Sequence, residues 1–115
     1  MAKYLIQVGY TPDAWAAMVK KPQNRLDAVR PVVENLGGKF EDAWLSFGDY
    51  DIIGIVDMPD NIGAAAFSMA VASGGAVRAF RTTPLLSVDE GVEAMRRAQK
   101  ARYQAPMRAT ARKTS

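Results

Sequence analysis

The chain has 115 residues, of which 49% are apolar and 23% charged, and its formal net charge is +3 at pH 7. This length fits one domain with its own core, and no apolar run approaches the roughly 18 residues that a membrane span needs. The chain contains neither cysteine nor histidine. Disulfides, zinc–thiolate sites, thiol nucleophiles and a Ser-His-Asp mechanism are therefore excluded.

Residues 3–10 are rich in β-formers and predict a first strand. Thr11 is expected to cap a short helix over residues 13–18, which the sequence before Pro22 interrupts. A second helical segment resumes near Pro22, with one apolar stripe that faces a sheet. The residues of this stripe are Leu26, Val29, Val33 and Leu36.

The rest of the chain predicts three strands and two helices. They are expected as strands over residues 40–47 and 52–58, a helix over 62–72, a strand over 77–86 and a helix over 88–103. Pro84 should place the last strand at a sheet edge, because proline has no backbone N–H to donate to a neighbouring strand. Ser87 and Glu90 have the spacing of a capping box at the start of the last helix.

The order βαββαβ followed by a helix predicts an α+β, ferredoxin-like fold. Its four-stranded antiparallel sheet would have helices on one face only. Yet the first and third strands offer apolar residues to both faces. Leu5 and Ile6 point to opposite faces in the first strand, and Ile55 and Val56 do so in the third. A strand that is apolar on both sides is covered on both sides. We therefore expect a homodimer or a higher homo-oligomer whose sheets pack face to face.

Charge is distributed unevenly along the chain. Residues 96–115 hold seven basic residues and no acid, whereas residues 1–95 have a net charge of −4. A basic patch on the folded domain, typical of nucleic-acid binders, is therefore not indicated. The basic tail could contact an acidic partner or serve as a solubilising extension. The first residues lack an apolar signal core, so a cytoplasmic location is expected.

Several short segments together resemble the GYD-domain family. The turn Gly48-Asp49-Tyr50-Asp51 resembles its G-x-Y-D signature. The other similar segments are Tyr4-Leu-Ile-Gln, Tyr10-Thr-Pro, Pro22-Gln-Asn-Arg25, Leu36-Gly-Gly-Lys39, Pro59-Asp60-Asn61, Gly75-Ala-Val-Arg78 and Thr82-Thr-Pro-Leu85. The resemblance covers residues 1–98 and leaves residues 99–115 as the end of the last helix and a basic tail that we expect to be disordered.

The resemblance implies a bacterial or archaeal domain of the dimeric α/β-barrel type. Proteins of similar fold include ligand-sensing domains of transcription regulators and small cofactor-free isomerases and monooxygenases. Fold alone does not give function, so three hypotheses stay open. The chain could be a homo-oligomeric small-molecule-binding or assembly domain, a small cofactor-independent enzyme with a pocket near the dimer seam, or a purely structural protein.

The residues Gly48, Tyr50 and Asp51 have at least three interpretations. Glycine and aspartate are typical of a hairpin turn, Tyr50 and Asp51 could line a ligand pocket, and Asp51 could act in acid–base catalysis. Asp49 and Asp51 have the spacing of calcium ligands, but no loop with further oxygen ligands follows. No metal site and no cofactor are therefore expected.

Four strand residues complete the set of candidate ligand-binding residues. They are Gln7, Tyr10, Arg78 and Arg81. An arginine could hold a carboxylate ligand by a bidentate pair. The alternative is an edge-strand arginine in solvent or in an intersubunit ion pair.

Overall fold

The computed structural model describes residues 1–106. Its elements are β1 (Ala2–Tyr10), α1 (Pro12–Lys20), α2 (Leu26–Asn35), β2 (Lys39–Leu45), β3 (Ile52–Met58), α3 (Asn61–Ser73), β4 (Val77–Leu85) and α4 (Val88–Lys100). Residues 1–85 form one compact unit, and the chain from Leu86 onward, which includes α4, forms a second. Within residues 1–106, no helix is both long enough and apolar enough to cross a membrane.

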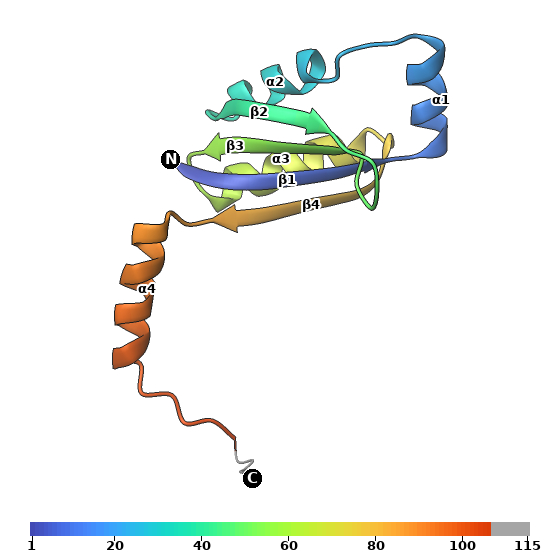
Figure 1. Ribbon diagram of the computed structural model, residues 1–115. Helices are drawn as coiled ribbons and strands as arrows, with labels where there is room; N and C mark the ends of the chain where they lie inside the picture. The colour runs from blue at the N-terminus through green and yellow to red at the C-terminus, as the bar shows by residue number, and fades with distance from the viewer. Residues whose placement is uncertain (107–115) are drawn as a thin grey trace. The chain divides into compact units, whose positions relative to one another are not determined.

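The first unit is built on one four-stranded sheet in the order β2-β3-β1-β4, and every pairing in it is antiparallel (Figure 1). This topology confirms the predicted α+β, ferredoxin-like fold. β4 lies at an edge, where Pro84 pairs with Tyr4 of β1. The missing N–H of Pro84 is therefore tolerated, as expected from its position in the sequence.

One face of the sheet forms the core with α2 and α3. Figure 1 views the sheet from the opposite side, so that α3 lies behind the strands. Alternate residues of β1 and β3 point into this core, as the two-residue period of a strand requires. The buried core residues are Tyr4, Ile6, Val8, Tyr10, Val33, Phe40, Val56, Met58, Ala64 and Phe67. The predicted apolar stripe of the second helix packs here through Val33 and its neighbours on α2.

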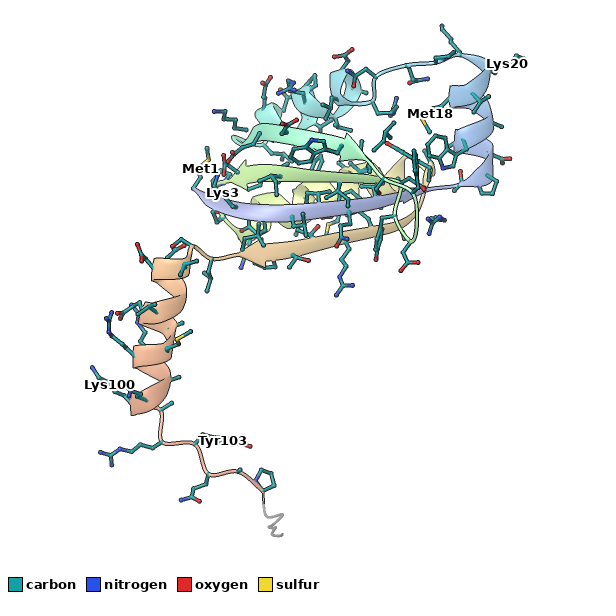
Figure 2. The ribbon with its side chains drawn as sticks, in the orientation of Figure 1. Met1, Lys3, Met18, Lys20, Lys100 and Tyr103 are labelled. Atoms are coloured by element: carbon teal, nitrogen blue, oxygen red, sulfur yellow. The ribbon has the colours of Figure 1, made fainter. Side chains whose placement is uncertain are left out.

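The helix starts follow the predicted capping residues. The Thr11 side chain accepts a hydrogen bond from the Ala14 N–H at 3.1 Å, which satisfies a free donor at the start of α1. Ser87 and Glu90 form the expected capping box on α4. In Figure 2, Met18 points from α1 toward the sheet, where it packs against the core.

Three predicted boundaries are wrong by a few residues. α2 begins at Leu26 and not near Pro22, because the Asn24 side chain accepts from the Leu26 N–H at 2.9 Å and starts the helix there. β2 ends at Leu45, two residues before the predicted end. α4 ends at Lys100 instead of residue 103, since Arg102 adopts a positive φ of 57°. A left-handed residue stops a helix.

The predicted tail is described only in part. Residues 101–106 have no regular helix or strand. The expectation that the tail is disordered otherwise falls on residues 107–115, which lie outside the described residues.

No element of residues 1–85 covers the second face of the sheet. Its centre is apolar, with half-buried Leu5, Ile53 and Ile55 beside an exposed Trp44. We call these four residues the open apolar face. The expectation that a second subunit covers them stays a prediction.

The close approach of the turn after α2 to β3 gives a test of the core. A Cβ on Gly38 would lie 2.5 Å from the Asp57 carbonyl oxygen and would also overlap the Met58 sulfur. Overpacking of this kind costs about 2 kcal/mol, so Gly38→Ala should lower the free energy of unfolding by that amount in urea titrations. Gly74→Ala is the matched control, because its Cβ would meet its nearest neighbour at an ordinary 3.5 Å. Equal stability of the two variants would contradict this packing.

Candidate functional site

The Asp51 carboxylate connects three elements at one end of the sheet. Its Oδ2 accepts hydrogen bonds from the Tyr10 backbone N–H at 2.8 Å and from the Trp15 indole N–H at 3.2 Å. The Tyr10 N–H needs this partner because the pairing of β1 with β4 shifts register between Gly9 and Tyr10. Asp51 thus joins the start of β3 to the end of β1 and to α1.

The turn that contains Asp51 is held by its own backbone and by one serine. Ser46 closes it twice, since its N–H donates to the Asp51 carbonyl at 2.9 Å and its hydroxyl donates to the Tyr50 carbonyl at 2.7 Å. This closure explains why β2 ends at Leu45. The residue types of the signature therefore have a structural role in this turn, which was one of the interpretations left open from the sequence.

Three of the predicted site residues meet on the edge of the open sheet face. Tyr50, Arg78 and Arg81 line a shallow depression beside the turn. The Arg78 guanidinium lies over Gly9, donates to the Asp49 carbonyl at 2.8 Å and lies 3.6 Å from Asp51 Oδ2. Arg78 is therefore engaged in holding the turn.

Gln7 and Tyr10 lie on opposite faces of β1. Gln7 pairs with Arg81 across the β1–β4 ladder, next to this depression. Tyr10 is 8% exposed and points to the helix side. The structure thus brings Gln7, Tyr50, Arg78 and Arg81 to one region and places Tyr10 in another, with Asp51 between them.

The helix side contains a cavity of about 270 Å³ between the sheet and the two helices α2 and α3. Its lining is mostly apolar and comes from all four strands and both helices. Small residues create the space: Gly54 and Ala43 pair on the sheet floor, while Ala28 and Ala70 line it from α2 and α3. The Phe40 ring takes up part of the space over Gly54, because a Cβ there would lie 3.1 Å from it.

Two polar side chains reach this cavity, and they are Tyr10 and Arg25. Burial raises the pKa of the Tyr10 phenol above its ordinary value, although the nearby Arg25 guanidinium opposes the shift. Tyr10 therefore keeps its proton at neutral pH and can donate a hydrogen bond. Its ring packs edge-to-face on Trp15, with ring centroids 5.7 Å apart, which fixes its direction.

Arg25 is half-buried in the loop just before α2. Its guanidinium donates to the Gln23 side-chain oxygen at 2.8 Å, which orients the group. Within residues 1–106, no carboxylate forms an ion pair with Arg25. A second cavity, of about 420 Å³ under α1 and beside β2, also has Tyr10 and Arg25 in its lining. The two polar groups therefore stand where two hollows adjoin.

The sequence did not indicate Arg25 as a candidate. It belongs to a loop, and only the crossover from β1 to α2 brings it to the end of β1. A weak signal existed, because Pro22 to Arg25 is one of the segments that resemble the GYD-domain family. Among residues 1–106, no group of three or more metal-ligating side chains is placed to hold an ion.

Residues 4–106 match the GYD domain family. The chain therefore belongs to that family, as its resemblance indicated, and the match runs past residue 98, where we expected the resemblance to end. No curated protein matches the chain.

The Asp51 contacts predict a stability effect. Asp51→Ala would leave the Tyr10 N–H and the Trp15 indole without their acceptor, so we expect a loss of about 2 kcal/mol in the free energy of unfolding. Asp49→Ala, in the same turn, removes an exposed carboxylate with no such contacts and should change stability by less than about 0.5 kcal/mol. Urea titrations of both variants at one protein concentration decide this, and equal effects would exclude the role given to Asp51.

Proposed function

We propose that this GYD-domain protein is a homo-oligomeric small-molecule-binding protein whose ligand occupies the cavity between the sheet, α2 and α3. The observation that supports this most is the cavity itself, which is apolar except for Tyr10 and Arg25. Ligand sites are typically apolar hollows with a few placed polar groups. Water in such a space makes few hydrogen bonds, so its displacement by an apolar ligand is favourable.

The volume sets the size of the ligand. An apolar protein cavity of roughly 150 Å³ holds one benzene molecule. The cavity here measures about 270 Å³, so we expect a ligand of roughly ten to twelve non-hydrogen atoms by proportion. The predicted residue Tyr10 would contact this ligand, whereas Gln7, Tyr50, Arg78 and Arg81 lie outside the cavity.

The contacts of the titratable groups favour binding over catalysis. The Asp51 carboxylate already accepts from the Tyr10 N–H and the Trp15 indole, so its oxygen serves as a structural acceptor. The buried phenol of Tyr10 has a raised pKa, which makes it a donor and a poor base at neutral pH. A cofactor-independent enzyme would need a free base at the cavity. With these contacts, neither Asp51 nor Tyr10 is available as that base.

We propose that a second copy of the chain covers the open apolar face. The residues Leu5, Ile53, Ile55 and Trp44 are apolar on a side that no element of residues 1–85 covers, and an exposed apolar sheet face is typical of an interface. Stacking of two such faces would give the dimeric α/β-barrel arrangement that the resemblance implied.

The two ends of this face differ in charge, which favours one way of stacking. At one end Lys3 contacts both Glu41 and Asp57, so two carboxylates there share one lysine. At the other end Arg81 has no ion pair among the described residues. Sheets related by a two-fold axis across the strands would place Arg81 of each subunit near the acidic end of the other.

Filling the cavity tests the binding proposal. Ala70 lines it from α3 near its exposed rim, so Ala70→Phe should occupy part of the volume without loss of stability. We expect 1-octanol, an uncharged probe, to bind at least about tenfold more weakly to this variant in calorimetric titrations. Ala72→Phe, exposed on the same helix and outside the lining, should bind as the parent does. Equal binding by both variants would place the probe elsewhere.

A charge on the open apolar face tests the assembly proposal. Ile55→Lys should convert the dimer into a monomer in sedimentation equilibrium, because the lysine charge would be buried against the partner. Ile62→Lys is the control, since Ile62 is 80% exposed on α3 and should leave the dimer intact. A monomeric parent protein, or nuclear Overhauser contacts between Ile55 and α4 of the same chain, would contradict coverage by a second copy.

A further inference from the structure

The clearest unexplained charge in residues 1–106 is the guanidinium of Arg25. It is half-buried and lines an apolar cavity. It donates to the neutral amide oxygen of Gln23 and lies beside the Tyr10 phenol, and neither of these partners carries a negative charge. Removing a cation partly from water costs free energy unless an anion or several acceptors compensate it. Among the described residues, Gln23 orients this guanidinium and no carboxylate forms an ion pair with it.

A second donor stands beside it. Tyr10 lines the same cavity, and its hydroxyl lies beside the Arg25 guanidinium. Its ring is fixed by the edge-to-face contact with Trp15 and by the hydrogen bond of the Tyr10 N–H to Asp51. A phenol hydroxyl with a fixed direction next to an arginine guanidinium can bind a carboxylate, because the carboxylate accepts hydrogen bonds from both groups. The rest of the cavity is apolar and suits a hydrocarbon body.

We infer that the ligand of this cavity is a small amphipathic monocarboxylate, with its carboxylate on Arg25 and Tyr10 and its apolar body between α2, α3 and the sheet floor at Gly54 and Ala43. This inference rests on the proposed function, because it names the chemical class of ligand for the same cavity. It excludes a neutral or cationic ligand as the preferred occupant.

The basic depression on the other face is a weaker site for the same ligand. Arg78 there is engaged with the Asp49 carbonyl and lies near Asp51, and the depression is polar and shallow, with Gly48, Asp49 and Tyr50 in its lining. It offers no apolar volume for a hydrocarbon body. Arg81 at this depression therefore serves as a control with the same charge as Arg25 and a different location.

The test uses the full-length protein and two probes that differ in the head group. Octanoate and 1-octanol have similar apolar bodies, and calorimetric titration gives the affinity of each. We expect octanoate to bind the parent protein at least about tenfold more tightly, as expected for a charge-assisted pair. Arg25→Gln should remove most of this preference while 1-octanol still binds, whereas Arg81→Gln, with the same change in net charge, should keep it.

The outcomes separate the two proposals. If both probes bind the parent protein equally, or if Arg25→Gln keeps the preference, the carboxylate inference is wrong and the cavity remains a binding site for apolar molecules. If neither probe binds up to its solubility limit, the proposed function fails and the inference fails with it. Loss of the preference in Arg81→Gln alone would move the carboxylate site to the opposite face of the sheet.

Tyr10→Phe separates the hydrogen bond from the charge. This variant keeps the ring and its packing on Trp15 and removes only the hydroxyl. We expect octanoate to bind about three- to tenfold more weakly, consistent with one lost hydrogen bond, and 1-octanol to change less. An unchanged affinity for octanoate would show that the phenol does not contact the carboxylate.

Discussion

The hydrogen bond from the Tyr10 N–H to Asp51 is the contact on which the proposed site depends. The register shift at the end of β1 takes the Tyr10 N–H out of the regular ladder, and Asp51 provides the acceptor at 2.8 Å. The same carboxylate oxygen accepts from Trp15, whose ring then packs against the Tyr10 ring. One acidic residue of a turn therefore sets the direction of the phenol on the other side of the strand.

The sheet separates the two proposed properties of the molecule. On its helix side, small residues such as Ala43 and Ala70 line a cavity between the sheet and the helices α2 and α3. On its other side, the open apolar face leaves Trp44 57% exposed. Asp51 lies between these regions, in contact with Tyr10 on one side and within 3.6 Å of Arg78 on the other. Ligand binding and assembly would therefore use separate surfaces joined at one turn.

The local signals in the sequence predicted most of the fold. Thr11, Ser87 and Pro84 act through contacts within a few residues or through one ladder position, so their roles could be read from the chain. The candidate site was harder, because it depends on long-range placement. Gln7 and Tyr10 are three residues apart on one strand and so face opposite ways, which divides the predicted set. Arg25 reaches the cavity only through the path of the crossover, and the residues that line the cavity are dispersed over six elements.

The most direct test of the cavity as the ligand site is a methyl NMR titration of the full-length protein with octanoate. Val29, Val71 and Val77 line the cavity, while Leu5, Ile53 and Ile55 lie on the open apolar face. We expect saturable shifts of the three valine methyl groups, with the methyl groups of the open apolar face unchanged. Shifts that are confined to Leu5, Ile53 and Ile55, or no saturable shifts at any methyl group, would contradict it.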